Sequence, residues 1–356
     1  MKKLVSKLRA KKQPQEPVGR ITTDTLAEHR ERVLAGGRKF KYPVQYQRHK
    51  LVVNALIIGA IGLVLLIALM WYLLYVAKNT SEFMYRVTKV VPVPVAVVDG
   101  QQVRYSDYLM KYRSTAHYLV EKEQIDERSE DGKNRLSYVK SQALDDAIAD
   151  AYAEKLAREL DITVTEADIE ERLKLQRQEW GVTETTFNAV VSDYYGWSTG
   201  EYRDAMKSQI LRQKVSFAVD SDAENLSKQV VAAVKGGNTD LATIAESFNA
   251  KKEGTATYIP ANWVSKTNQD GGLAEAAAKL EKGQVSPAVK TTSGNGYYYV
   301  KLLDSNDTQV NFEYIFIPLR EFDAQITEVT KDDALTRFIT LEKPDAPATE
   351  QTKNQE

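Results

Sequence analysis

The sequence contains no cysteine and only three histidines among its 356 residues. Without cysteine there is no disulfide, no thiolate nucleophile and no cysteine-ligated zinc, so the fold must rest on packing. The histidines, His29, His49 and His117, form no cluster, and neither an HExxH motif nor a glycine-rich phosphate loop is present. Metal, nucleotide and hydrolase functions therefore find no support, and no cofactor is expected.

Net charge is also nearly absent, at -1, but the two ends of the chain differ in sign. Residues 1–50 carry 14 Lys and Arg against 4 Asp and Glu, whereas residues 51–356 carry 34 against 45. The chain therefore has a basic head and an acidic body. In the head, residues 1–20 are predicted to be unstructured, and residues 23–35 to form a short helix that ends at Gly36-Gly37.

One long stretch lacks charge altogether. Residues 51–77 read LVVNALIIGAIGLVLLIALMWYLLYVA, in which Asn54 is the only strongly polar side chain. About 20 residues suffice to cross the hydrocarbon core of a bilayer, so this stretch predicts an uncleaved transmembrane helix. A buried core helix rarely stays apolar on every face for so long. A signal peptide would have a shorter apolar region that begins closer to the N-terminus.

Basic residues before the apolar stretch outnumber those after it, which predicts a cytoplasmic N-terminus. The preceding flank holds Arg38, Lys39, Lys41, Arg48, His49 and Lys50, and the following one holds Lys78, Arg86 and Lys89. Trp71, Tyr72 and Tyr75 would lie at the outer interface. The protein is thus expected in the plasma membrane, with residues 1–50 as a basic cytoplasmic tail and the large C-terminal part outside the cell's cytoplasm. A cysteine-free ectodomain is more typical of bacteria than of eukaryotes.

The ectodomain begins with a predicted hairpin at Asp99-Gly100, after which Ser106 is expected to cap a helix. Apolar residues then recur every three or four positions, and Thr165 with Asp168 and Ser198 with Glu201 have capping-box spacing. About five helices are expected over residues 93–219. Two stripes should be buried, one formed by Leu144, Ile148, Tyr152 and Leu156 and the other by Tyr202, Met206 and Ile210.

From residue 220 the pattern changes to mixed helices and strands. Helices are expected at 222–236, 239–248 and within GGLAEAAAKL, and strand-like pieces at TATYIPANWV, GYYYVKLLD and VNFEYIFIPL. This predicts a small α+β domain with an antiparallel sheet over residues 220–320. Residues 321–342 are interpreted as a C-terminal helix or extension, and residues 343–356 as a disordered tail.

The hairpin VAVVDGQQVRYSDYL, followed by TEADIEERL, VTETTFNAVVSDYYGWSTGEYRDAM and QILRQKV, resembles the N-terminal chaperone domain of the SurA, PrsA and PpiD family of extracytoplasmic foldases. NTDLATIAESF and LEKGQVSPAVKTTSGNGYYYVKLLD resemble their parvulin-type prolyl isomerase domain. The resemblance covers residues 93–320 or so, and the single N-terminal anchor is most like PpiD. It implies a membrane anchor, a helical SurA-N-like domain and a parvulin-like α+β domain.

Active parvulins use a pair of histidines, and residues 220–342 contain none. Tyr298 stands in the GYHIIK-like position of one histidine, and Tyr314 in the position of the other if 310–318 replaces the usual first strand. KVSFAVD, at 214–220, either continues the preceding helix or supplies that first strand. A hairpin that pairs 310–318 with 296–303 would make the sheet a permuted parvulin sheet.

By this resemblance Tyr298 and Tyr314 are candidate catalytic residues, and Tyr258, Trp263 and Phe316 candidate substrate-binding residues; no metal site is expected. Tyrosine donates and accepts hydrogen bonds, so both tyrosines suit catalysis as well as cross-strand packing. The other three residues suit a proline pocket as well as a core.

Three functions remain open. The first is a membrane-tethered chaperone for unfolded or newly exported polypeptides, with the export machinery among its expected partners and with a weak or inactive isomerase-like domain. The second is an active peptidyl-prolyl isomerase. The third is a non-enzymatic scaffold for cell-envelope assembly. For the basic head, a topology signal explains the charges and no nucleic acid partner is expected.

Overall fold

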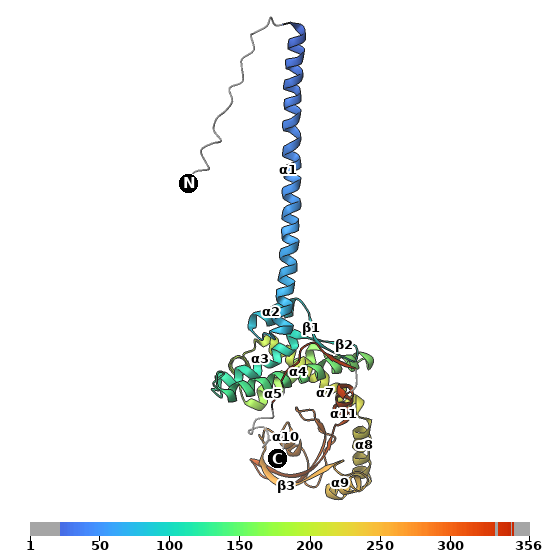
Figure 1. The fold of residues 1–356 in the computed structure, drawn as a ribbon. Coiled ribbons are helices and arrows are strands. Elements are labelled where there is room, and N and C mark those ends of the chain that lie inside the picture. Colours follow the sequence, from blue (N-terminus) through green and yellow to red (C-terminus); the bar gives the residue numbers. More distant parts are fainter. Residues whose placement is uncertain (1–21, 332–333, 343, 345–356) are drawn as a thin grey trace. The chain divides into compact units, whose positions relative to one another are not determined.

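The computed structural model describes residues 22–331, 334–342 and 344, and for residues 36–48 it describes the backbone only. The chain divides into two compact units, one that ends at Leu73 and one that starts at Leu74. The prediction for residues 1–20 lies outside the described residues, and so does that for the tail 343–356 except at residue 344. Figure 1 gives the order of the elements along the chain.

The described part of the first unit is one long helix, α1 (Thr23–Trp71). It continues as a π-helical turn, η1 (Tyr72–Val76), whose last three residues belong to the second unit. The predicted end at Gly36-Gly37 is wrong, because the helix passes through both glycines. An interior glycine costs a helix only about 1 kcal/mol, and the flanking Ala, Leu, Arg and Lys are good helix formers.

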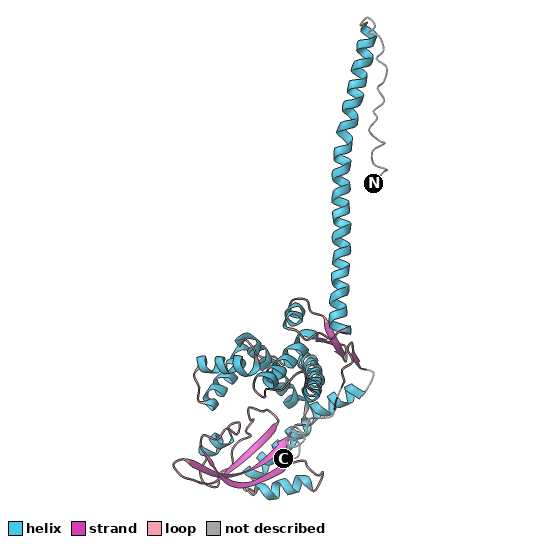
Figure 2. Cartoon of the chain, turned by 60° about the vertical axis from the view of Figure 1, so that its left-hand side comes forward, coloured by secondary structure: helices cyan, strands magenta, loops and turns pink. Residues whose placement is uncertain are grey.

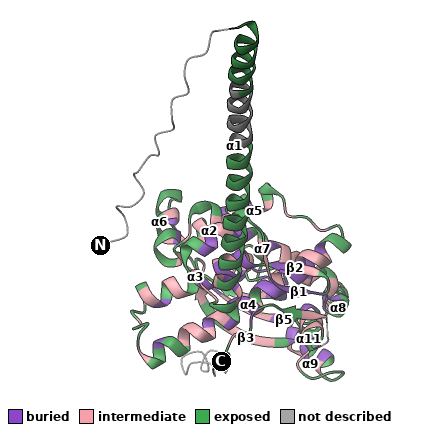
Figure 3. Cartoon of the chain, turned by 45° about the horizontal axis from the view of Figure 1, so that its top comes forward, coloured by how far each residue is buried: buried purple, intermediate pink, exposed green. Residues whose placement is uncertain are grey.

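The apolar part of this helix runs from His49 to Val76, with a mean hydropathy of 2.8 over its most apolar window. It is the single helix among the described residues that is long and apolar enough to cross a membrane. Every residue from 49 to 69 is exposed, and Figure 3 colours this part of α1 as exposed. At 1.5 Å per residue its 28 residues extend for about 42 Å, which exceeds the ~30 Å hydrocarbon core.

The second unit opens with a helix that the sequence analysis missed, α2 (Glu82–Val90), and then the predicted hairpin of β1 (Pro94–Val98) and β2 (Gln101–Arg104). Asp99 and Gly100 at the turn both have positive φ, 45° and 78°, as a tight hairpin with two left-handed residues requires. A short C-terminal strand, β6 (Leu335–Arg337), pairs with the other edge of β1. The sheet therefore has the order β2-β1-β6.

Five helices follow, as predicted: α3 (Tyr105–Glu121), α4 (Glu130–Glu159), α5 (Glu166–Trp180), α6 (Glu184–Tyr195) and α7 (Thr199–Val219). The cap predicted at Ser106 is wrong. Helix α3 starts two residues earlier than such a cap requires, with Arg104 as N-cap and Tyr105 as first residue, and the Tyr105 N–H donates to the Val93 carbonyl. Ser106 is buried within the first turn.

The capping boxes predicted for α5 and α7 are both formed. The stripe Tyr202, Met206 and Ile210 of α7 is buried, and it packs against Ile169, Leu173, Phe187 and Val191 of α5 and α6. On α4, Leu144, Ile148 and Tyr152 are buried as expected, whereas Leu156 of the same stripe is only half-buried. Local capping signals and side-chain periodicity therefore predicted this bundle well.

Helix α7 continues through residues 214–219 and ends just before Asp220, so the KVSFAVD segment continues the preceding helix and does not form a strand. The Asp220 side chain accepts hydrogen bonds from two segments of the chain. Its Oδ1 accepts the Ala223 N–H at the start of α8 (2.9 Å), and its Oδ2 accepts the N–H groups of Arg320 (2.7 Å) and Glu321 (3.1 Å). The carboxylate is 4% exposed and links the entry of the α+β part to its exit.

The α+β part contains α8 (Ser221–Lys235), α9 (Leu241–Asn249), β3 (Thr257–Ser265), α10 (Leu273–Ala278), β4 (Gly296–Ser305) and β5 (Gln309–Pro318), and α11 (Glu321–Lys331) follows it. The three strands form an antiparallel sheet in the order β3-β5-β4, drawn in magenta in Figure 2. The pairing predicted between 310–318 and 296–303 is present. Buried residues on one face of the sheet pack with α8 and α9, and those on the other with α10.

Candidate functional site

Three of the five predicted site residues lie together on the α10 face of the sheet. In the antiparallel register Tyr298 is opposite Phe316, and Tyr314 is opposite Val300. The rings of Tyr298 and Phe316 stack with centroids 4.5 Å apart, and those of Tyr298 and Tyr314 lie 5.9 Å apart. Side chains two residues apart on a strand share a face, so the hairpin brings all three into one aromatic group.

The Tyr298 hydroxyl belongs to a small group of polar side chains in the loop just before β4. It donates to Asn295 Oδ1 at 3.0 Å, and the Ser293 hydroxyl donates to the same oxygen at 2.9 Å. Thr291 Oγ1 lies 2.7 Å from Ser293 Oγ. Burial raises the pKa of Tyr298 and of Tyr314 above the usual tyrosine value, so both are neutral phenols at pH 7.

The other two predicted residues lie elsewhere. Tyr258 packs against the core on the opposite face of the sheet, and its hydroxyl donates to Glu313 Oε2 at 2.9 Å. Burial is the first cause that raises its pKa to about 12, and the bond to Glu313 adds to it. Trp263 is paired with Asn311 and is 42% exposed. Val310 and Phe312, on either side of Asn311, are the residues that pack on the α10 face of the sheet. Tyr258 and Trp263 are therefore not grouped with Tyr298.

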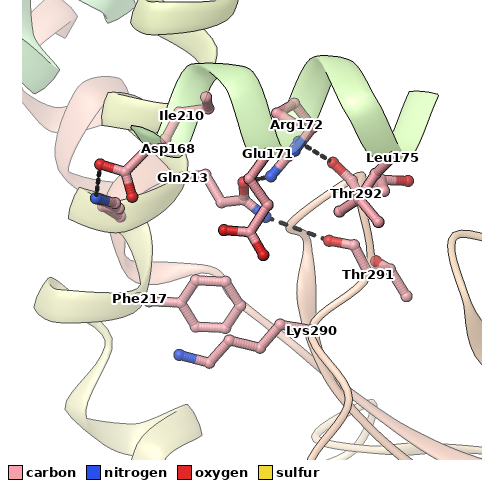
Figure 4. A pocket seen from close by; sticks show the side chains of 11 residues that line it. Asp168, Glu171, Arg172, Leu175, Ile210, Gln213, Phe217, Lys290, Thr291 and Thr292 are labelled. Carbon is pink, nitrogen blue, oxygen red and sulfur yellow. Dashed lines mark hydrogen bonds and ion pairs between the residues drawn. The ribbon is translucent and has the colours of Figure 1, made fainter. Parts of the chain in front are cut away.

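A second feature of this unit is a cleft of about 520 Å³ between the helical bundle and the loop that precedes β4. Figure 4 shows it from close by: α5 and α7 supply one wall, and Lys290, Thr291 and Thr292 supply the other. Its apolar lining consists of Leu175, Ile210 and Phe217. Leu175 is 41% exposed, so an apolar side chain is available to a ligand in the cleft.

Charged side chains surround this apolar lining. They are Asp168, Glu171, Arg172, Lys214 and Lys290. Three cations against two anions give the cleft a slight positive balance, and the aliphatic stems of the longer side chains add apolar surface. The Lys290 ammonium lies 4.2 Å from the centre of the Phe217 ring and 5.5 Å from that of Tyr297, within the range of cation–π attraction.

Two side chains of the bundle hold the loop that forms the far wall of the cleft. Arg172 donates to the Thr292 carbonyl at 2.7 Å and to Gln213 Oε1 at 2.6 Å, and Gln213 Nε2 donates to the Thr291 carbonyl at 3.3 Å. Burial lowers the pKa of Arg172, which remains a cation at any physiological pH. The same loop carries the polar group around Tyr298, so it connects the cleft with the aromatic group.

At the base of the cleft Asp168 is strongly held as a carboxylate. It accepts hydrogen bonds from the Thr165 N–H (2.7 Å) and hydroxyl (2.8 Å), and Lys214 Nζ lies 2.9 Å away. The Thr165 backbone bond is the first of the causes that lower the pKa of Asp168 to about 2. Its charge is therefore fixed at neutral pH and fixes the position of Lys214.

The cleft residues were not predicted as a site. Asp168 was identified for its capping-box spacing and Ile210 for its place in a buried stripe, but nothing in the sequence pairs α5 with residues 290–292, which are about 120 positions away. Leu175, an exposed leucine on a polar helix, was the one local signal. Among the described residues there is no group of three or more His, Cys, Asp or Glu that could hold a metal ion.

With this geometry in place, the comparisons with known proteins define the class. Residues 45–216 match the family model described as the SurA-like N-terminal domain. This part of the chain is therefore a SurA-like N-terminal domain, which confirms the resemblance to the SurA, PrsA and PpiD family. This similarity supports a chaperone role.

Among solved structures, one match comes from a study that describes the virulence factor PEB4 and the periplasmic protein Cj1289 of Campylobacter jejuni as two structurally related SurA-like chaperones. The match has 16% identity and a TM-score of 0.27, and it covers 67% of this chain and 92% of the other. At those values it adds no argument about function. No curated protein matches the chain.

Proposed function

We propose that the protein is a membrane-anchored extracytoplasmic chaperone that binds unfolded, newly exported polypeptides. The observation that carries this proposal is the cleft, in which exposed Leu175 and the ring of Phe217 lie within a border of charges of both signs. The SurA-like domain over residues 45–216 supports it independently.

The cleft suits extended segments of many sequences. Successive side chains of an extended client alternate in direction, so one apolar side chain enters the cleft while its neighbours meet the charged border. Burial of a Leu or Phe side chain contributes about 1.5–3 kcal/mol, which gives weak binding at any one segment. Weak binding that depends on apolar character alone is what a chaperone for many clients needs.

The apolar helix from His49 to Val76 supports the anchor, and the excess of basic residues before it supports a cytoplasmic N-terminus. Anchoring would hold the cleft close to the site of export and raise its local concentration around emerging chains. The export machinery is proposed as a neighbour on this ground. Protease added outside intact cells should then digest the second unit and spare the basic head.

For the α+β part we infer a permuted parvulin-like domain over residues 220–320. The strand order β3-β5-β4 supports this, and the bridges of Val285 with Lys301 and Val289 with Tyr298 add a further extended segment beside β4. The barrier to rotation of a peptide bond is about 18–20 kcal/mol, and two neutral phenols at the histidine positions favour weak or absent catalysis. An active prolyl isomerase is the second candidate function, because Tyr298 and Tyr314 lie side by side and a phenol can donate and accept a hydrogen bond.

The test of the chaperone function is suppression of aggregation of a chemically unfolded protein by the full chain in lipid nanodiscs. Leu175→Ser should weaken client binding about tenfold, because a loss of ~1.5 kcal/mol of apolar burial corresponds to that factor. Leu160→Ser is the matched control, since Leu160 is 47% exposed and lies outside the cleft lining. Equal activity of the two variants would contradict the role of the cleft, and no suppression by the parent chain would contradict the chaperone function.

A further inference from the structure

Helix α2 has apolar side chains on two opposite faces. Its inner face holds Met84, Tyr85 and Thr88, all buried, and α2 packs against α3. A surface helix of a soluble body would carry polar residues on its other face. In α2 the other face is formed by residues 83, 86, 87 and 90, which recur at helical spacing and are Phe, Arg, Val and Val.

Most of this outer face is open to solvent, while Val87 is half-buried. Phe83 is 64% exposed, Val90 81% and Val91, just after the helix, 56%. In the second unit these are the three most exposed of the large hydrophobic residues, and they lie within nine positions of one another. Single exposed apolar residues are ordinary, but such a group on one short helix marks a surface that is covered by something.

The position of α2 in the chain indicates what covers it. The last residues of the apolar helix already belong to the second unit: Leu74 is 3% exposed and its carbonyl accepts the Tyr105 hydroxyl at 2.7 Å, and the Tyr75 hydroxyl donates to the Pro94 carbonyl at 2.7 Å. Only residues 77–81 separate Val76 from the start of α2. Five residues span at most about 17 Å when fully extended, so α2 cannot lie far from the end of an anchored helix.

The charges around α2 fit a phospholipid surface. Residues 77–91 carry Lys78, Arg86 and Lys89 against Glu82 alone, although the body as a whole is acidic. Arg86 pairs with Glu82 but its side chain remains 75% exposed, and Lys89, 3.7 Å from Asp204, remains 51% exposed. Basic residues that flank an apolar helix face are typical of helices that lie in the interface of an anionic bilayer.

We propose that α2 lies in the headgroup region of the membrane, with Phe83 and Val90 inserted and Arg86 at the phosphates. This inference rests on the anchor of the proposed function and adds a second attachment to it. A helix anchor alone leaves the body free to rotate about the membrane normal. A second contact through α2 fixes one side of the bundle against the bilayer.

The absence of cysteine makes a direct test possible, because one introduced cysteine can be labelled without background. The full chain is reconstituted in vesicles of phosphatidylethanolamine and phosphatidylglycerol, with a polarity-sensitive fluorophore at Val90→Cys, at Leu63→Cys within the apolar helix, or at Leu160→Cys as an exposed control. Emission wavelength, quenching by aqueous iodide and quenching by brominated lipid are measured at each position.

The proposal predicts that the labels at positions 63 and 90 are blue-shifted, quenched by brominated lipid and protected from iodide, while the label at 160 shows the opposite. If position 63 meets lipid and position 90 behaves like position 160, the anchor stands and the α2 contact is overturned, which would leave a protein partner as the occupant of that face. If position 63 itself meets water, the anchor and this inference both fail.

Discussion

Tyr298 and Tyr314 lie with their ring centroids 5.9 Å apart, on one face of the hairpin formed by β4 and β5. Tyr298 is 9% exposed and bonded to Asn295, while burial raises the pKa of both phenols. The Tyr298 hydroxyl, neutral and bonded to Asn295, is well suited to hold the sheet to the loop before it, and Tyr314 packs beside it. The pair offers no group that titrates near neutral pH.

Tyr298→Phe should therefore cost about 1 kcal/mol of stability through the lost bond to Asn295, and leave any acceleration of X-Pro exchange unchanged at a low level. Stability is measured by urea unfolding and exchange by NMR of a proline peptide. Tyr299→Phe is the matched control, because its hydroxyl lies 2.6 Å from Ser227 Oγ on the other face. Rapid exchange in the parent chain that Tyr298→Phe abolishes and Tyr299→Phe preserves would establish the isomerase instead.

The carboxylate of Asp168 should make stability depend on pH in the acid range. Its pKa is lowered to about 2 in the folded chain, against 3.8 when unperturbed. The folded state therefore binds the proton more weakly, so the contribution is fully present above about pH 4 and is lost as pH falls toward 2. Asp168→Ala should cost about 1 kcal/mol at pH 7 and progressively less below pH 4.

Asp168→Asn serves as the control, because its side-chain oxygen still accepts the Thr165 N–H while the charge toward Lys214 is gone. It should be intermediate between the parent and Asp168→Ala at pH 7. A cost of Asp168→Ala that stays constant from pH 7 to pH 2 would show that the charge contributes nothing.

The pairing of β6 with β1 should make the C-terminal segment necessary for the stability of the N-terminal hairpin. The backbone N–H of Asp99 donates to the Ala334 carbonyl (2.8 Å), and the backbone N–H of Phe338 donates to the Val95 carbonyl (3.0 Å). Ile339 is 2% exposed. Truncation of a buried isoleucine to alanine lowers the free energy of unfolding by about 2–5 kcal/mol. A chain that ends at Lys331 should therefore melt at a lower temperature and lose amide protection at Asp99.

A chain that ends at residue 344 keeps β6 and provides the control for this truncation. It should retain the melting temperature and the amide protection of the full chain. If ending the chain at Lys331 changes neither quantity, β6 does not contribute to the hairpin's stability.

The helical bundle could be predicted from the sequence because its signals are local. Thr165 with Asp168 and Ser198 with Glu201 mark helix starts within four residues, and the stripe Tyr202, Met206 and Ile210 is visible as a repeat. The hairpin of β4 and β5 could be predicted for the same reason, since both strands flank one turn. None of these features needs knowledge of distant parts of the chain.

The features that sequence reasoning missed depend on distant contacts or small shifts. Strand β6 has three residues and no pattern of its own, and it forms because β1, some 240 positions earlier, has a free edge. The register of the pairing between β3 and β5 shifts between Ile259 and Asn262. The regular alternation of side chains between the two faces of the sheet is therefore interrupted there. Composition alone could not separate Tyr258 and Trp263 from Phe316, nor place Leu175 opposite Lys290.

If the cleft binds unfolded chains, a photoreactive group placed in it should crosslink to them. A photoreactive label is placed at Leu175→Cys or at Leu160→Cys in the full chain in nanodiscs, and a client is added either unfolded or native. Adducts with the unfolded client are expected at position 175, with few at position 160 and few with the native client. Equal adducts at the two positions, or equal adducts with native and unfolded client, would contradict the binding of unfolded chains by the cleft.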